Sequence, residues 1–128
     1  MKEYMFLIRN EIDHQAAWSP EQHQRFLNKC RDYIASLKAE GKLKSAQPLI
    51  REGKIISGSE GAWREGHFAE SKEVIVGYYH ILAEDLKDAI AIAKRNPEFE
   101  HGTTARIEVR PVKMKEESID YVYPKHNG

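Results

Sequence analysis

The sequence predicts an α+β protein with the ferredoxin-like order β-α-β-β-α-β, in which an antiparallel sheet carries both helices on one face. Three observations support this prediction: an apolar stripe at helical spacing in residues 20–40, the apolar run VIVGYYHIL, and a second helical pattern in residues 84–96 that precedes an alternating strand. With 128 residues, the chain is expected to form a single domain. Its core is expected in residues 4–113, followed by a polar tail in residues 114–128.

The first part of the chain predicts a strand and a long helix. Residues 4–9, YMFLIR, are a short apolar run of the kind that forms a buried strand. Ser19 is a good N-cap residue, and Gln22 completes a capping box with it. Gly41 suits the position just after a helix, so the helix is expected near residues 20–40. Its apolar stripe consists of Phe26, Leu27, Cys30, Tyr33, Ile34 and Leu37.

The middle of the chain predicts two strands with an excursion between them. Residues 43–50, LKSAQPLI, indicate a weaker strand at an edge, because Pro48 cannot donate a ladder hydrogen bond. Glycines punctuate residues 51–66, which favours a hairpin excursion. Residues 74–83, VIVGYYHILA, have the strongest strand pattern in the chain.

The last part of the expected core predicts a second helix and a final strand. Asp85 is a good N-cap for a helix in residues 84–96, and Pro97 ends it. Residues 104–113 alternate between apolar and charged side chains, as a half-buried strand does. The tail contains a possible short strand in the segment IDYVY.

Composition argues against several classes of partner. Twenty basic and twenty acidic residues cancel, so no net charge favours nucleic acid or an anionic membrane. The only cysteine, Cys30, excludes an intrachain disulfide and suits a reducing compartment. The apolar stretch near the start has five residues, too few for a signal-peptide core or a membrane span. A cytoplasmic protein without nucleic-acid or membrane partners is therefore expected.

The segment REGHFAESKE, followed by VIVGYYHILAEDLKDAIAIAKRNPEF and IEVRPV, resembles the YCII-related superfamily in its DGPF-domain branch. The agreeing positions are Phe68, Ala69, Glu70, Lys72, Glu73, Gly77, Tyr78, Tyr79, Glu108, Val109, Arg110 and Pro111. The departures from the pattern are Glu65, His67, Ser71 and Val76. The resemblance implies a dimeric α/β barrel, in which two copies of the chain pair sheet to sheet as a homodimer. It implies little chemistry, because most members have no established activity.

In the shorter YciI-like branch of this superfamily, a histidine on the first helix and an aspartate after the second are the suspected catalytic pair. By spacing from Gly41 and Pro97, those positions hold Cys30 and Asn96 here. Asparagine does not titrate, and a cysteine in an apolar stripe is usually inert. The inherited acid-base pair is therefore not expected in this chain.

Strand alternation places the charged residues of the last strand together. Ala105, Ile107, Val109 and Pro111 share one face, which should meet the helices, and Arg106, Glu108 and Arg110 share the other. In residues 74–83 one face carries Ile75, Gly77, Tyr79 and Ile81, and the other Val74, Val76, Tyr78 and His80. Which of these faces meets the helices stays open, because a one-residue register change reverses them. If the face that contains Gly77 meets the helices, the barrel interior holds Tyr78, His80, Arg106, Glu108 and Arg110.

That charged row has two interpretations. A structural ion-pair ladder across the dimer is one, because buried charges are normally paired. A pocket that recognises an anion is the other. The loop residues Glu70, Lys72 and Glu73 are likewise either a structural lock or the lip of a pocket.

The six histidines include no pair at metal-ligand spacing, so no metal and no cofactor are expected. His80 is the only histidine in a predicted strand, which makes it the best acid-base candidate, with Glu108 or Glu70 as its partner.

Three functional hypotheses follow. The preferred one is a homodimeric module that binds a small molecule, with an anion as one candidate, between aromatic walls from Tyr33, Tyr78 or Tyr79. The second is a lyase, an isomerase or a cofactor-free oxygenase that uses the His80 pair. The third is a regulatory module with an exposed apolar patch near Trp18 or Trp63.

Overall fold

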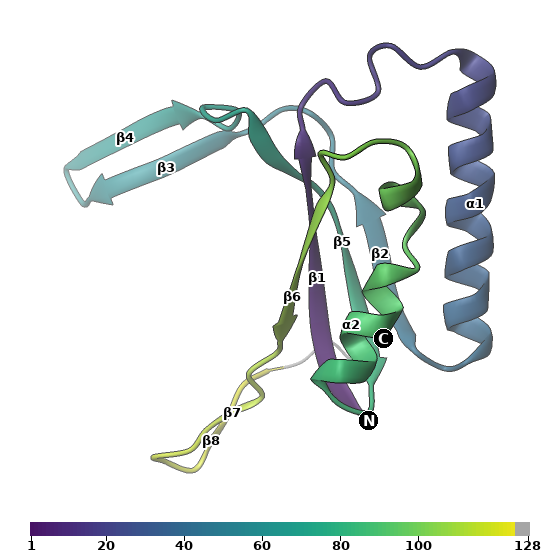
Figure 1. The fold of residues 1–128 in the computed structure, drawn as a ribbon. Helices are drawn as coiled ribbons and strands as arrows, with labels where there is room; N and C mark the ends of the chain where they lie inside the picture. Colours follow the sequence, from purple (N-terminus) through teal and green to yellow (C-terminus); the bar gives the residue numbers. More distant parts are fainter. Residues whose placement is uncertain (125–128) are drawn as a thin grey trace.

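The computed structural model describes residues 1–124 and contains a four-stranded antiparallel sheet with the order β2-β5-β1-β6 (Figure 1). The elements are β1 (Lys2–Glu11), α1 (Pro20–Ala39), β2 (Leu43–Pro48), β3 (Lys54–Ser59), β4 (Ala62–His67), β5 (Glu73–Ala83), α2 (Leu86–Lys94), the 3-10 helix η1 (Pro97–Glu100), β6 (Arg106–Pro111), β7 (Lys115–Glu116) and β8 (Tyr121–Val122). Once the β3–β4 excursion is set aside, this is the predicted ferredoxin-like arrangement.

The ends of α1 are set by local chemistry, as predicted. The Ser19 hydroxyl accepts a hydrogen bond from the Gln22 backbone N–H, and the Gln22 side chain accepts one from the Ser19 N–H at 2.8 Å. At the other end, Gly41 has φ +71°. The N–H of Lys42 donates to the carbonyl of Leu37 at 2.9 Å, which completes a Schellman motif.

Both helices cover the same face of the sheet. In β1, Tyr4, Phe6 and Ile8 are buried in one cluster, which also contains Leu37 from α1 and Ile92 from α2. Ile107 and Val109 of β6 pack against this cluster, so the apolar face of the last strand meets the helices as predicted. No helix in the described part of the chain covers the other face of the sheet, which we call the open face.

A β-bulge in β5 changes which of its residues share a face of the strand. Gly77 pairs with Ile8, but Ile75 pairs with Arg9, so Val76 is the extra residue. Tyr79 and Gly77 lie on the helix-covered face, and after the bulge that face continues with buried Val74. The prediction that Ile75 shares a face with Gly77 is therefore wrong, because the inserted residue reverses the alternation.

Gly77 allows a close approach of β2. A Cβ atom on Gly77 would lie 3.0 Å from the carbonyl oxygen of Gln47 and 3.3 Å from the Cα of Pro48. Both atoms belong to the backbone of the neighbouring strand, which cannot move aside without disturbing the pairing. The glycine therefore keeps β2 tightly beside β5.

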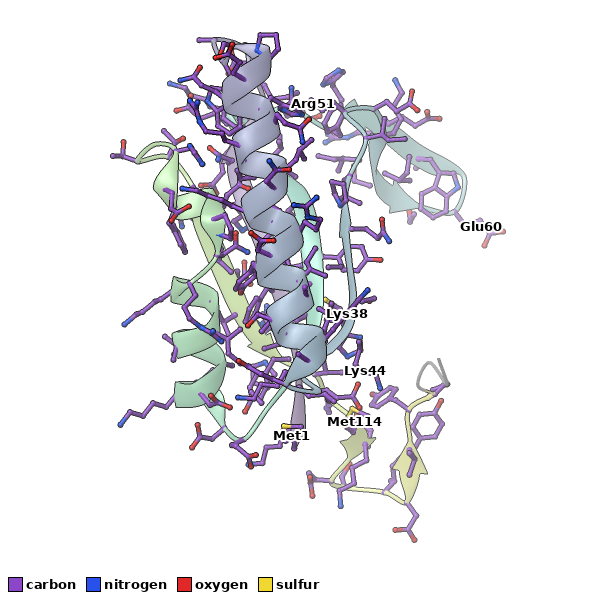
Figure 2. The ribbon with its side chains drawn as sticks, turned by 90° about the vertical axis from the view of Figure 1, so that its right-hand side faces the viewer. Met1, Lys38, Lys44, Arg51, Glu60 and Met114 are labelled. Carbon is purple, nitrogen blue, oxygen red and sulfur yellow. The ribbon has the colours of Figure 1, made fainter. Side chains whose placement is uncertain are left out.

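Two hairpins extend from this body (Figure 1). The predicted excursion is the β3–β4 hairpin, whose tip is marked by Glu60 in Figure 2. Its side chains Ile55, Ile56 and Trp63 are exposed. The predicted strand in the tail is β8, which pairs with β7, and the end of the tail, residues 125–128, lies outside the described residues. Within residues 1–124 neither α-helix has the length and apolarity needed to cross a bilayer.

Candidate functional site

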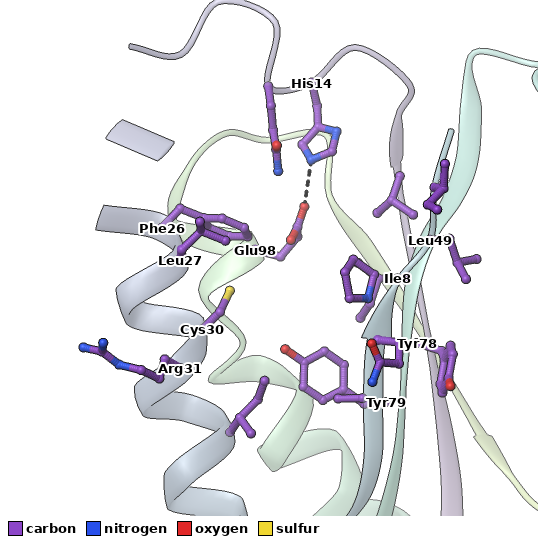
Figure 3. A pocket seen from close by; sticks show the side chains of 18 of the residues that line it. Ile8, His14, Phe26, Leu27, Cys30, Arg31, Leu49, Tyr78, Tyr79 and Glu98 are labelled. Carbon is purple, nitrogen blue, oxygen red and sulfur yellow. Dashed lines mark ion pairs between the residues drawn. The ribbon is translucent and has the colours of Figure 1, made fainter. Parts of the chain in front are cut away.

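A cavity of about 880 Å³ lies between α1 and the sheet edge formed by β2 and β5 (Figure 3). Only Phe26, Tyr33 and Leu37 of α1 are buried. The remaining members of the predicted apolar stripe, Leu27, Cys30 and Ile34, line the cavity. Most of the opposite wall is also apolar and includes Ile8, Val76, Tyr79, Pro48 and Leu49. Part of the apolar stripe therefore packs in the core, and the rest lines the cavity.

An ion pair between His14 and Glu98 lies at one end of this cavity (Figure 3). His14 Nε2 and Glu98 Oε1 are 3.1 Å apart, within ion-pair distance but off the axis of a straight hydrogen bond. Only 8% of the His14 side chain and 11% of the Glu98 side chain are exposed. His14 comes from the loop before α1 and Glu98 from η1, so the fold alone brings them together.

Neighbouring groups hold this pair in place. His14 Nδ1 lies 2.8 Å from the carbonyl oxygen of Glu11, and Glu98 Oε1 accepts a hydrogen bond of 3.2 Å from the Asn10 side chain. Asn10 is buried and is fixed in turn by Thr104, whose hydroxyl donates to Asn10 Oδ1 at 2.7 Å. These contacts leave the two side chains little freedom to turn away from each other.

The Cys30 thiol is part of the cavity wall but is unreactive. Burial, followed by the negative charges of Glu98 and Glu100, raises the pKa of the Cys30 thiol to about 12. A thiol with that pKa is almost entirely protonated at neutral pH and is a poor nucleophile. This agrees with the expectation that Cys30 is inert.

Asn96, the other position that the family spacing singled out, has a structural role. Its side-chain oxygen accepts a hydrogen bond from the backbone N–H of Glu98 at 2.9 Å and caps η1. Its Nδ2 atom has no hydrogen-bond partner within residues 1–124. The residue therefore helps to place Glu98 at the cavity.

Two predicted aromatic residues lie at this cavity and a third lies behind it. Tyr79 lines it with its ring, and Tyr78 borders it although its ring lies on the open face (Figure 3). The ring of Tyr33 packs edge-on against Tyr79 with the centroids 5.6 Å apart. Burial is the main cause of the raised pKa of both Tyr33 and Tyr79. Both phenols therefore stay protonated at physiological pH.

Basic residues occur in the mostly apolar lining of this cavity. Arg31 and Lys38 of α1 and Arg51 after β2 line the cavity, whereas Glu98 is the only acidic residue that residues 1–124 contribute to it. Arg31 lies 3.9 Å from exposed Asp32, and no ion pair involves Lys38 or Arg51 within residues 1–124. Arg51 lies beside the N-terminal half of α1 and Lys38 near its C-terminal end (Figure 2). The guanidinium of Arg31 points away from the cavity (Figure 3), so Lys38 and Arg51 are the basic residues that remain to give it positive charge.

The predicted charged row lies on the open face and not at this cavity. Glu108 accepts hydrogen bonds from Arg9 at 2.9 Å and from Arg110 at 3.0 Å, and Glu73 lies 3.3 Å from Arg106. Within one chain, the side chains of Arg106 and Arg110 are 73% and 65% exposed. The row is thus an ion-pair network within a single sheet. Its seclusion in a barrel stays a prediction.

The predicted acid-base residues His80 and Glu108 lie on the open face but apart from each other. They belong to β5 and β6, with β1 between these strands. His80 Nε2 lies 2.8 Å from Glu3 Oε1, and Lys44 Nζ lies 3.7 Å from the same oxygen. The structure therefore gives His80 the partner Glu3, and neither His80 nor Glu108 lines the cavity.

The loop before β5 is also separate from the cavity. Lys72 is exposed, and its Nζ lies 3.5 Å from Glu11 Oε1. Glu70 lines a smaller hollow of about 380 Å³ against the β3–β4 hairpin. The roles proposed for Glu70 and Lys72 in ligand binding stay predictions.

The two tryptophans have different surroundings. Trp18 is half-buried, and its ring lies 5.2 Å from that of Phe26 and 5.3 Å from that of His101. Trp63, on the hairpin, is 62% exposed. Trp63 is thus an exposed side chain on the hairpin, and the apolar patch and the partner that the regulatory hypothesis expects stay predictions.

Sequence reasoning missed both members of the ion pair. His14 belongs to a loop without periodicity, and Glu98 follows Pro97 outside the helical pattern. One indirect signal was present in the sequence. Cys30 and Asn96 cannot serve as an acid-base pair, so any such pair had to consist of other residues. Among residues 1–124, no three His, Cys, Asp or Glu side chains are arranged as a metal site.

Comparison with curated proteins found no match. The family model for the YCII-related domain matches residues 2–113, which are 112 of the 128 residues. The matched region includes all four strands of the main sheet, both α-helices and every residue that lines the cavity. The chain therefore belongs to the YCII-related domain family.

Proposed function

We propose that this protein binds a small, mostly apolar molecule that carries an anionic group, and that it does so in the cavity between α1 and β2. Ligand sites commonly have volumes of about 300–1,000 Å³ and apolar walls with a few fixed polar groups. The cavity of about 880 Å³ has this composition. The size and the lining of this cavity are the observation on which the proposal rests.

The charges at the cavity support the choice of an anion. The basic residues Lys38 and Arg51 line it, and its carboxylate, on Glu98, already faces His14. A carboxylate or sulfonate on the ligand would therefore meet positive charge, while its apolar part covers Leu27, Ile34 and Val76. This places the anion at a different site from the arginine row of the open face.

A matched pair of fluorescent probes tests the proposal. 1-Anilinonaphthalene-8-sulfonate carries an anion, and N-phenyl-1-naphthylamine is its uncharged counterpart. Both should bind with one site per chain, the sulfonate more tightly. Replacing Lys38 and Arg51 by glutamine should weaken sulfonate binding by about two- to fivefold, because an exposed ion pair contributes about 0.2–1 kcal/mol. Binding of the neutral probe should stay within error.

A blocking variant shows whether these probes bind in the cavity. Ala35→Trp places a large side chain in the lining, and Ala39→Trp places it one turn further along the same helix, outside the lining. The first variant should abolish binding of both probes, and the second should bind them like the unaltered protein. Equal binding by all three proteins would disprove the proposed site.

We further propose that two copies of the chain associate through their open faces. Met5, Leu7 and Tyr78 lie on this face beside the charged network, half-buried although no helix covers them. An apolar strip bordered by paired charges suits a symmetric interface, in which each copy offers the same surface. Such pairing would also seclude Arg106 and Arg110 from water.

Light scattering at micromolar concentration tests the association. The expected mass is twice the chain mass of 14.8 kDa. Leu7→Arg should give the single-chain mass, because it places a charge in the middle of the interface. Ile90→Arg on the exposed side of α2 is the control and should leave the mass doubled. A single-chain mass for the unaltered protein would refute the proposal.

A further inference from the structure

The neighbours of His14 and Glu98 fix how the two side chains face each other. The Glu11 carbonyl can only accept, so His14 Nδ1 must carry a hydrogen. Nε2 is therefore the ring nitrogen that faces the carboxylate, 3.1 Å from Glu98 Oε1. The Asn10 amide donates to the same oxygen, so Oε1 is held from two sides.

The remaining oxygen of the carboxylate is available. Glu98 Oε2 accepts no hydrogen bond within residues 1–124, and Glu98 lines the cavity. One oxygen of Glu98 is therefore fixed by Asn10 and His14 while the other has free lone pairs. That oxygen is the one placed to take a proton from a molecule bound in the cavity.

We infer that Glu98 and His14 form an acid-base pair that moves protons on the molecule bound in the cavity, Glu98 as the base and His14 as the acid. This inference rests on the proposed binding function. The substrate class is a largely apolar molecule with an ionisable C–H bond next to an electron-withdrawing group.

The reaction class is an isomerisation or an elimination. The C–H bond of the substrate breaks and an O–H bond forms at Glu98, while His14 Nε2 donates its proton to the atom on which negative charge develops. Glu98 then releases its proton to water and His14 takes one up from water, which restores the pair. This cycle consumes no oxidant and no co-reactant, and it leaves Cys30 protonated throughout.

The opening of 5-nitrobenzisoxazole tests the pair without knowledge of the natural substrate. A base removes the C3 proton of this flat, apolar molecule, the N–O bond breaks, and the coloured 2-cyano-4-nitrophenolate forms. Glu98 would take the proton, and His14 would stabilise the developing phenolate. We expect saturable catalysis above the buffer rate. Loss of a positioned base typically costs 10²–10⁴-fold, so Glu98→Gln should lower the rate by at least tenfold.

Two further variants complete this test. His14→Gln should also lower the rate, whereas Glu100→Gln should leave it unchanged, because Glu100 is exposed, pairs with Lys29 and does not line the cavity. Binding of N-phenyl-1-naphthylamine and the melting temperature must stay near their original values in each. If Glu98→Gln fails to fold, Ala35→Trp serves instead, because blocking the cavity must return the rate to that of buffer.

The possible failures are distinguishable. Absence of probe binding would refute the proposed binding function, and the inference with it. Probe binding with a phenolate rate equal to that of buffer would overturn the acid-base pair alone. So would a rate that is the same in the unaltered protein, Glu98→Gln and His14→Gln.

Discussion

The hydroxyl of Tyr33 in α1 donates a hydrogen bond of 2.8 Å to the backbone carbonyl of Ile92 in α2. This carbonyl also accepts a hydrogen bond from the backbone N–H of Arg95 at 3.1 Å. The two helices that cover the sheet are thus joined by a buried polar contact behind the cavity. Beside it the Tyr33 ring packs against Tyr79, which forms part of the cavity wall.

Tyr33→Phe should lower the free energy of unfolding by about 1 kcal/mol, the usual net contribution of one hydrogen bond. The loss should be no larger, because the Ile92 carbonyl keeps its bond to Arg95. Urea unfolding followed by circular dichroism gives the value. Tyr121→Phe, at an exposed position, is the control and should leave stability unchanged. An unchanged midpoint for Tyr33→Phe would show that this bond contributes nothing.

Gly77→Ala should destabilise the edge of the sheet. The new Cβ would lie 3.0 Å from the Gln47 carbonyl oxygen, so β2 would have to move away from β5. Overpacking of this kind costs about 1–3 kcal/mol. Because β2 forms a wall of the cavity, binding of the fluorescent probes should weaken as well. Urea unfolding and probe titration measure the two effects, and a variant as stable as the unaltered protein would contradict the tight approach.

Cys30 should react slowly with thiol reagents. With a pKa of about 12, its thiolate fraction at pH 8 is roughly three orders of magnitude below that of a free cysteine. Labelling by 5,5′-dithiobis(2-nitrobenzoate) should be correspondingly slow in the folded protein and fast in urea. A saturating cavity ligand should slow it further, because Cys30 lines the cavity. Labelling of the folded protein at the rate seen in urea would contradict this.

Stability should fall in mild acid partly because of Glu108. Hydrogen bonds from Arg110 and then from Arg9 lower the pKa of Glu108 below its ordinary value of 4.5. In the unfolded chain this carboxyl binds its proton at a higher pH. Its contribution to stability is therefore complete above about pH 4.5 and is lost as the pH falls through the lowered folded-state value.

Glu108→Gln should flatten this acid dependence in urea unfolding measured between pH 3 and pH 7. Glu117→Gln, at an exposed site, should leave the profile unchanged. Part of the slope should remain in both variants, because hydrogen bonding, first from the backbone N–H of Glu84, also lowers the pKa of Asp88. Identical profiles for Glu108→Gln and the unaltered protein would show that the network on the open face does not hold this carboxylate.

The sequence by itself determined the elements, their order and the ends of α1. These features depend on local chemistry: the Ser19–Gln22 capping box, the glycine after the helix, and the alternation of residues 106–111. Local alternation also placed the charged residues of β6 on the correct face. It failed in β5, because the bulge at Val76 depends on pairing with β1 and has no signal in β5 itself.

Only the tertiary structure decided the candidate site. The stripe of α1 indicated which residues avoid water, but the distance between α1 and β2 decided that Leu27 and Ile34 line a cavity rather than a core. Likewise, His14 and Glu98 meet because β1, α1 and η1 converge at one end of that cavity. A contact between segments so far apart in the chain depends on packing, which leaves no periodic pattern in the sequence.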